Sequence, residues 1–295
     1  MNYMSAFAYY LFRLFERIIF SIPLVFLYLI ADLIFVLLYY FPGYRRKVVA
    51  LNLRNAFPEK SEKELRIIAR KFYRHLADLF IEVLKLNHLS SKELLKRCRI
   101  ENTELLERLW SEGRDVVAVL GHYNNWEYLT ILPSVSRYKF ISVYKPLKNK
   151  YFDRHMIRLR ARHGMILAPM SQVVRQIITF KGMNEKVLVS LLSDQTPARG
   201  DIHYWTTFLN QDTPVYLGAE KISSKYDMAV IFFNCQKIKR GYYRTNIELL
   251  FEHTKGLPEY EITEAHVRRL DEIIRQKPEF WLWSHHRWKH KRETF

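Results

Sequence analysis

The sequence contains few cysteines and few glycines, and no stretch of it is repeated or compositionally biased. Its two cysteines, Cys98 and Cys235, stand far apart and away from other potential ligands. This spacing fits neither a metal site nor a redox motif, and it does not predict a disulfide framework. With 9 glycines in 295 residues, the chain also lacks the flexible linkers of a multi-domain array. We therefore expect one compact domain with an appendage.

Acidic residues are outnumbered by basic ones. The sequence has 30 aspartates and glutamates against 47 lysines and arginines, a formal net charge of +17. A positive excess of this size attracts polyanions, which include nucleic acid, anionic lipid head groups and acidic proteins. A basic soluble surface without such a partner is the alternative, and the charge alone does not choose between them.

An apolar N-terminus favours the membrane among these partners. Residues 18–40 read IIFSIPLVFLYLIADLIFVLLYY, in which Asp32 is the single charge. At about 1.5 Å of rise per residue, a helix of this length can cross a hydrocarbon core of about 30 Å. Asp32 and Pro23 equally allow a helix that lies within one leaflet, and a buried core helix is a further alternative. Two arginines precede the run, but the basic residues 45–47 favour a cytoplasmic position for its C-terminal end. We therefore predict that residues 1–48 form a membrane-anchoring region.

Downstream of this region the sequence predicts helices first, and then alternating strands and helices. Capping boxes formed by Ser61 with Glu64 and by Ser90 with Glu93 predict two helix starts, and Asn102 predicts a third. Short buried strands are predicted at residues 115–120, 139–144, 186–192 and 228–234, with a hairpin partner at 241–251. Further helices are predicted at residues 125–132, 151–163, 171–181, 214–225 and 264–276, the fourth opened by Thr213 and Pro214.

This alternation predicts the fold class. Strands that alternate with helices form an α/β fold, here with a mixed, mostly parallel central sheet flanked by helices. The ligand sites of such sheets gather where strands end and helices begin. Catalytic side chains are therefore expected on the loops that follow the strands.

The loop after the strand at 115–120 carries the strongest candidate. In AVLGHYNNWEYLTIL, His122 follows that strand, and Glu127 comes five residues later, in the first turn of the next helix. A glutamate there can bond one imidazole nitrogen, which leaves the other nitrogen free to take a proton from a hydroxyl. The same spacing occurs at His88–Glu93 and His266–Asp271, so context rather than spacing distinguishes this pair. A core histidine bonded to its neighbour is the alternative.

Several segments resemble one protein family in their order and approximate spacing. They read NLRNAFPEKSE (52–62), GHYNNWE (121–127), VYKPLKN (143–149), RLRARHG (158–164), SDQTP (193–197) and WLWSHHRWK (281–289). Together they resemble the late acyltransferases of bacterial lipid A biosynthesis, within the wider lysophospholipid acyltransferase group. The resemblance covers nearly the whole chain.

The resemblance implies roles for particular residues. His122 would be the general base and Glu127 its carboxylate partner. The substrate-binding residues that it implies are Asn125, Lys145, Asn149, Arg158, Arg160, Asp194 and Gln195. Lys145 stands where many members carry arginine, a change that keeps the charge but loses the two-pronged geometry. Arg158 and Arg160 point to different sides of their predicted helix, so the arginines of this helix cannot all serve one ligand.

The C-terminal SHHRWKHKR (284–292) combines aromatic residues with cations. This composition suits a membrane interface, and it would also suit single-stranded nucleic acid. No signature of a nucleic-acid module accompanies it, and nucleic acid is therefore not an expected partner. The histidines lack a matching set of carboxylates or cysteines, so no metal site is expected.

The sequence thus predicts an acyltransferase domain at residues 49–295, attached to the cytoplasmic face of the inner membrane. The resemblance implies an acyl carrier protein thioester as donor and a lipid A precursor as acceptor, with no metal and no free cofactor. Two alternatives stay open. An acyltransferase of this kind can act on another lipid, such as an aminolipid, a glycolipid or a lysophospholipid. A non-catalytic, basic membrane-binding protein would not need His122.

Overall fold

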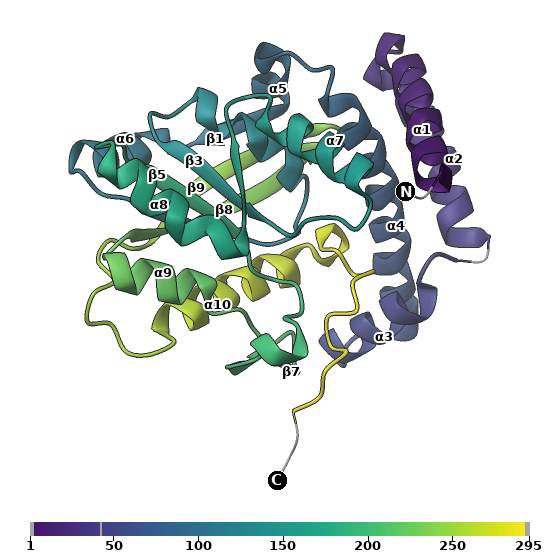
Figure 1. Ribbon diagram of the computed structural model, residues 1–295. Helices are drawn as coiled ribbons and strands as arrows, with labels where there is room; N and C mark the ends of the chain where they lie inside the picture. Colours follow the sequence, from purple (N-terminus) through teal and green to yellow (C-terminus); the bar gives the residue numbers. More distant parts are fainter. Residues whose placement is uncertain (1–2, 42, 293–295) are drawn as a thin grey trace.

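A seven-stranded sheet forms the centre of the computed structural model, which describes residues 3–41 and 43–292 (Figure 1). Met1, Asn2 and Pro42 of the predicted anchor lie outside the described residues, as do residues 293–295. The strand order is β1-β9-β8-β2-β5-β3-β4. The strands are β1 (Cys98–Glu101), β2 (Val116–Leu120), β3 (Lys139–Tyr144), β4 (Ile166–Pro169), β5 (Val187–Leu192), β8 (Ala229–Lys239) and β9 (Tyr242–Phe251).

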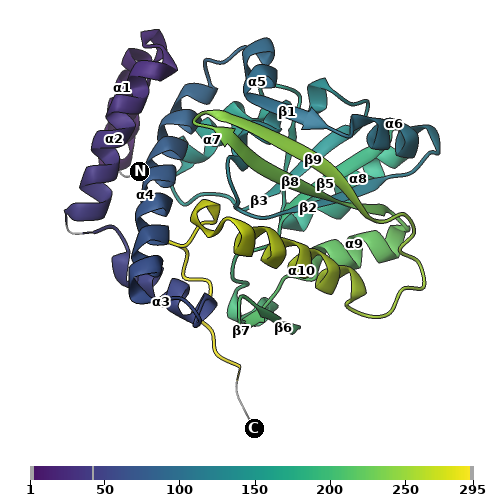
Figure 2. The same cartoon turned by 180° about the vertical axis from the view of Figure 1, so that it is seen from behind.

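Neighbouring strands of this sheet run parallel, apart from the antiparallel hairpin of β8 and β9. All five residues of β2 are buried, because this strand has neighbours on both sides and helices cover both of its faces. In Figures 1 and 2, α5 (Ser91–Arg97) and α7 (Lys150–Ala161) lie above the sheet, and α9 (Gly218–Tyr226) and α10 (Glu261–Gln276) lie below it. The predicted α/β fold with a mostly parallel sheet is confirmed.

Further helices complete this framework. They are α3 (Arg46–Ala56), α4 (Glu62–Leu86), α6 (Thr103–Ser111) and α8 (Val173–Gly182). Both predicted capping boxes are present: Ser61 and Glu64 cap α4 reciprocally, and Ser90 and Glu93 cap α5. Each box satisfies backbone N–H groups that have no partner within the helix.

The predicted apolar N-terminal run is two helices. α1 (Tyr3–Ser21) ends just before Pro23, and α2 (Leu24–Tyr40) begins just after it. Proline lacks the N–H that a continuous helix would need at this position, and its ring clashes with the preceding turn. α1 and α2 stand at one end of the molecule beside α4 (Figure 2). Within residues 3–41 and 43–292, no helix combines the length and the apolar character that a membrane crossing requires.

The predicted helix at 214–225 is wrong at its start. Thr213 and Pro214 belong to β7 (Gln211–Pro214), which pairs with β6 (Trp205–Phe208) in a small antiparallel hairpin. α9 begins four residues later than predicted, at Gly218. Thr213 is fully buried and accepts a hydrogen bond from the indole of Trp288, so its side chain serves tertiary packing and not a helix cap. The helix predicted at 125–132 is the 3₁₀ helix η1 (Trp126–Ser134).

Candidate functional site

His122 and Asp194 meet beyond the C-terminal ends of β2 and β5, two strands in the middle of the sheet. β2 and β5 are parallel neighbours, and Leu120 at the end of β2 lies opposite Leu192 at the end of β5. His122 and Asp194 each follow two residues later, so the register of the two strands brings their loops together. Nδ1 of His122 lies 2.6 Å from Oδ1 of Asp194, and the backbone N–H of His122 donates to Oδ2 at 2.8 Å.

Asp194 is buried, and its environment favours the ionised form. Trp281 donates its indole N–H to Oδ2 at 2.8 Å, beside the bond from the His122 backbone. Burial alone would raise the pKa of this carboxyl. The positive charge that the imidazole of His122 carries when it is protonated, together with the hydrogen bonds from His122 and Trp281, outweighs burial and lowers the pKa of Asp194 to about 2. The carboxylate therefore accepts three hydrogen bonds and holds the imidazole in one orientation.

The second imidazole nitrogen of His122 faces the amide of Gln195. Nε2 of Gln195 lies 3.1 Å from Nε2 of His122. A carboxylate only accepts hydrogen bonds, whereas an amide NH₂ group only donates them. These partners therefore place the imidazole proton on Nδ1, toward Asp194, and the lone pair on Nε2. The ring of Trp126 packs edge-on against the imidazole, with 4.9 Å between the ring centres.

Glu127 does not hold the imidazole as the sequence predicted. Its carboxylate is bound by Arg160 of α7, with Nε of Arg160 2.9 Å from Oε2 and a second contact from Nη2 to Oε1. η1 begins at Trp126, and this tight 3₁₀ turn directs Glu127 toward α7 while the neighbouring strand supplies Asp194. Burial opposes the charge of Arg160, but Glu127 raises the pKa of the guanidinium. The structure thus assigns the imidazole to Asp194 and makes Glu127 the partner of Arg160.

A cavity of about 540 Å³ opens beside the imidazole. Five of the predicted site residues line it together: His122, Glu127, Lys145, Arg160 and Gln195. The rest of the wall is largely apolar and includes Leu120, Leu129, Leu132, Val143, Met165, Met170, Leu191, Leu192 and Phe233. Thr130, Asp201 and several serines also line it. A pocket of this size, with polar groups in a mainly apolar wall, suits a small ligand or a chain with one reactive group.

Four predicted substrate-binding residues do not line this cavity: Asp194, which instead contacts His122, and Asn149, Arg158 and Asn125. Asn149 caps α7, and its side chain accepts hydrogen bonds from the backbone N–H groups of Tyr151 and Phe152. Arg158 lines a different cavity, on another side of α7, because two residues along a helix turn the side chain by about 200°. Asn125 lies buried beneath the loop that carries His122 and does not line the His122 cavity.

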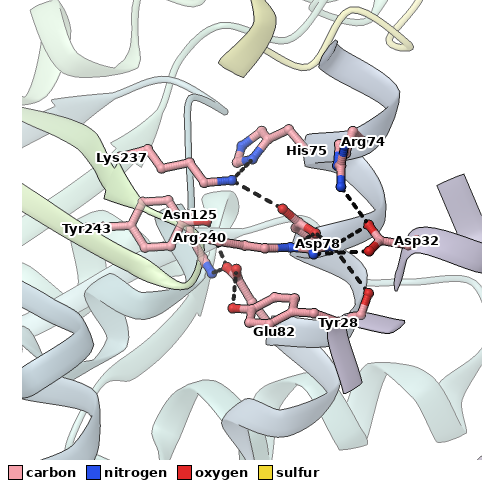
Figure 3. Close-up of polar contacts among 10 residues, drawn as sticks. All are labelled: Tyr28, Asp32, Arg74, His75, Asp78, Glu82, Asn125, Lys237, Arg240 and Tyr243. Carbon is pink, nitrogen blue, oxygen red and sulfur yellow. Dashed lines mark hydrogen bonds and ion pairs between the residues drawn. The ribbon is translucent and has the colours of Figure 1, made fainter. Parts of the chain in front are cut away.

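Asn125 is held by a buried carboxyl group. Its amide donates to Oε2 of Glu82 at 2.7 Å, and the hydroxyls of Tyr28 and Tyr243 donate to the same carboxyl group (Figure 3). The side-chain oxygen of Asn125 accepts the backbone N–H of Tyr128, so that it also caps η1. Burial raises the pKa of Glu82. These bonds connect α2, α4 and β9 to the segment between His122 and Glu127.

The same figure shows a second part of this network nearer to the surface. Arg240, from the turn of the β8–β9 hairpin, bonds Asp78 of α4 and Asp32 of α2, and Arg74 also reaches Asp32. Lys237 contacts Asp78 at 3.2 Å. Asp32, the acidic residue in the apolar run, therefore forms ion pairs that hold α2 against the rest of the domain.

The C-terminal stretch lies partly inside the molecule and partly at its surface, where His286, Lys289, Lys291 and Arg292 are exposed. Trp281 is 2% exposed, Trp283 0% and Arg287 1%. Arg287 is therefore a core residue and not part of the interface predicted for residues 284–292, whose exposed cations remain accessible. His285 accepts the backbone N–H of Thr196, close to Asp194 on the same loop. Composition could not indicate this role. The resemblance of WLWSHHRWK to the family was the available signal that the stretch belongs to the site.

An imidazole of fixed tautomer, with the lone pair of Nε2 at a largely apolar cavity, defines a site that can take a proton from a hydroxyl of a bound ligand. Residues 1–290 match the family described as bacterial lipid A biosynthesis acyltransferase, and the chain belongs to that family. A comparison with curated proteins gives no match. The family identifies the chain as an acyltransferase.

Proposed function

We propose that this acyltransferase moves a fatty acyl group from an acyl carrier protein thioester to a hydroxyl of a lipid A precursor. The observation that carries the proposal is Nε2 of His122, which bears its lone pair at the wall of an apolar cavity of about 540 Å³. Membership of the lipid A biosynthesis family supports the acceptor. The formal net charge of +17 supports an acidic carrier protein as the donor, because opposite charges speed association.

The proposed reaction needs a base and correct positioning. Nε2 of His122 takes the proton of the acceptor hydroxyl while that oxygen attacks the thioester carbonyl carbon. The tetrahedral intermediate then breaks its carbon–sulfur bond, and the imidazolium returns the proton to the leaving thiolate. Asp194 stabilises the imidazolium through Nδ1. Such a base contributes roughly 10²- to 10⁴-fold to the rate. The reaction as written uses no metal and no free cofactor.

Two cations of the cavity wall have parts in this proposal. Lys145 is exposed at the cavity and is available to phosphate groups of the acceptor. Arg160 is committed to Glu127, and the pair fixes α7 against η1. Glu127 therefore acts on the site through Arg160, as a positioning residue.

We also propose that the protein works at the cytoplasmic face of the inner membrane, with α1 and α2 lying in one leaflet. Apolar side chains of α2 are exposed, among them Val25, Phe26, Leu29 and Leu33, each at least 58% exposed. Such a surface is favourable when it lies among acyl chains. The basic residues 45–47 follow α2 and suit anionic head groups.

Acyl transfer in vitro tests the proposal. The wild type is incubated with labelled acyl carrier protein and a lipid A precursor, and it is compared with His122→Ala and with the distant control Arg268→Gln. Transfer by wild type and control, with a loss of at least about a hundredfold in His122→Ala, is expected. Transfer to an aminolipid or a lysophospholipid instead would reject the acceptor and keep the mechanism. Equal transfer by His122→Ala and wild type would reject the mechanism.

A further inference from the structure

A second cavity, of about 450 Å³, lies between α1 and α7. It shares no lining residue with the His122 cavity. Arg160 lines the His122 cavity and Arg158 the second one, since side chains two residues apart on a helix point in nearly opposite directions. α7 thus separates the two cavities. A ligand in the second cavity is a different ligand, or a different part of one, from that at the imidazole.

Both helices present the same kinds of side chain to the second cavity. On each, a tyrosine is followed along one face by two arginines, at spacings of three or four residues that keep side chains together. These residues are Tyr9, Arg13 and Arg17 on α1, and Tyr151, Arg154 and Arg158 on α7. Tyr10 and Leu14 of α1 complete the lining.

Several of these side chains are already held in place. The rings of Tyr9 and Tyr151 stack with 5.5 Å between their centres, and the guanidinium of Arg154 lies 5.3 Å over the ring of Tyr151. Arg13 donates to Glu16, which is 1% exposed and is itself bonded by other polar side chains. The aromatic wall and two of the cations are therefore positioned before any ligand arrives.

The charge in this cavity is largely uncompensated. Its eight lining residues include four arginines and no carboxylate. Glu16, which does not line the cavity, forms an ion pair with Arg13. Within residues 3–41 and 43–292, neither Arg17 nor Arg158 forms an ion pair. Guanidinium groups that converge on a recess match an anion with several acceptor oxygens, and phosphate meets this requirement best.

The rim of the cavity indicates where that phosphate comes from. Tyr10 and Leu14 line the cavity and are nevertheless 65% and 57% exposed, and Leu11 beside them is 58% exposed. A phosphate in the recess would thus have apolar side chains next to it at the opening. That combination fits a phospholipid, whose phosphate lies at head-group depth with its acyl chains alongside. A recess of this size also suits a head group better than the convex surface of an acidic protein.

We propose that the cavity between α1 and α7 binds the phosphate of a lipid head group in the membrane surface. This inference does not rest on acyl transfer, because the two cavities are separate and the test below measures binding. It gives α1 a specific lipid contact in addition to its apolar surface.

Vesicle flotation of the full chain tests the proposal. The vesicles are phosphatidylcholine alone, or phosphatidylcholine with phosphatidic acid. The double variant Arg17→Gln/Arg158→Gln is compared with the wild type and with Arg99→Gln/Arg268→Gln, which removes the same charge at exposed positions elsewhere. Circular dichroism establishes that all three proteins are folded.

The cavity variant is expected to lose about thirtyfold in binding to anionic vesicles, from about fivefold for each arginine at such a surface. The control variant should lose less than about threefold, and binding to neutral vesicles should be equal for all three proteins. Equal losses in both double variants would overturn the proposal, because general surface charge would then explain the binding.

Calorimetric titration with inorganic phosphate, without vesicles, distinguishes a lipid head group from a soluble phosphate compound as the ligand of the cavity. Unchanged vesicle binding in the cavity variant, together with loss of phosphate binding, would overturn the lipid source and assign the cavity to a soluble phosphate compound. If the variant kept both kinds of binding, the cavity would have no phosphate site, and its arginines would have to serve an acidic protein.

Discussion

Replacing Asp194 by asparagine should abolish most of the activity by reversing the imidazole tautomer. Oδ2 of Asp194 accepts two N–H donors, from the His122 backbone and the Trp281 indole. In Asp194→Asn the amide oxygen must stay with these donors, because the NH₂ group cannot accept them. The NH₂ group then faces Nδ1 of His122 and donates to it. The imidazole proton moves to Nε2, and the nitrogen at the cavity loses its lone pair.

The magnitude follows from what the lone pair contributes. A general base gives roughly 10²- to 10⁴-fold, and the same carboxylate-to-amide change in a Ser-His-Asp triad costs about 10⁴ in kcat. We expect kcat of Asp194→Asn to fall about 10³- to 10⁴-fold, which corresponds to about 4 to 5.5 kcal/mol in the barrier. KM should change little, because Asp194 does not line the His122 cavity.

Steady-state acyl transfer by Asp194→Asn, with Glu127→Gln as the matched control, measures the difference. Both variants replace one carboxylate by its amide near the same imidazole. Glu127→Gln should keep kcat within about tenfold of the wild type, since Glu127 bonds Arg160 and not His122. A full loss in Glu127→Gln combined with near-normal turnover in Asp194→Asn would refute the reasoning and restore Glu127 as the partner of the base.

Three further variants test neighbouring contacts. Arg160→Gln should cost about 2–3 kcal/mol of stability in urea unfolding, because it leaves the Glu127 carboxylate buried without its cation; if adding Glu127→Gln recovers none of it, the two are not coupled. Trp281→Phe removes a donor to a carboxylate and should destabilise by about 1.5–3 kcal/mol, with a wild-type melting temperature as the contrary result. Burial raises the pKa of Glu82. Between about pH 4.3, the pKa of an unfolded glutamate, and the higher native pKa, the native state therefore holds a proton that the unfolded chain has lost. The wild type loses stability as the pH rises through this range. Glu82→Gln does not titrate there, so its stability relative to the wild type should rise over that range, and a difference independent of pH would contradict the cause.

The sequence predicted His122 as a site residue, but it did not predict the carboxylate that contacts the imidazole. A buried strand followed by Gly121 and His122 is a local pattern, and so is the Asp194–Gln195 pair after the strand at 187–192. That these two strands are neighbours is a property of the sheet, since β3 and β4 lie between them in the chain. Sequence proximity favoured Glu127 for this reason. Local periodicity cannot report which loops a strand order brings together.

Composition was least informative where the chain packs against itself over long sequence distances. The composition of residues 284–292 suits a surface, yet Arg287 is a core residue, and so are Trp281 and Trp283 just before it, because the chain returns to the loop of Asp194. Thr213 and Pro214 fit a helix start, but pairing with β6 decided their conformation. By contrast, the capping boxes and the break at Pro23 depend on adjacent residues, and the sequence contained the whole signal.

The polar contacts that α2 makes with α4 and with the β8–β9 hairpin make α1 and α2 an integral part of the protein and not a detachable anchor. Tyr28 reaches the same carboxyl group that holds Asn125, and Asp32 neutralises Arg240. Lys85 of α4 likewise donates to backbone oxygens of residues 19 and 22. Deleting the apolar N-terminal helices would therefore expose buried charged side chains and remove contacts beneath the loop that carries His122. A movement of α2 relative to α4, including one caused by contact with a bilayer, would therefore be transmitted through Glu82 and Asn125 to the loop that carries His122.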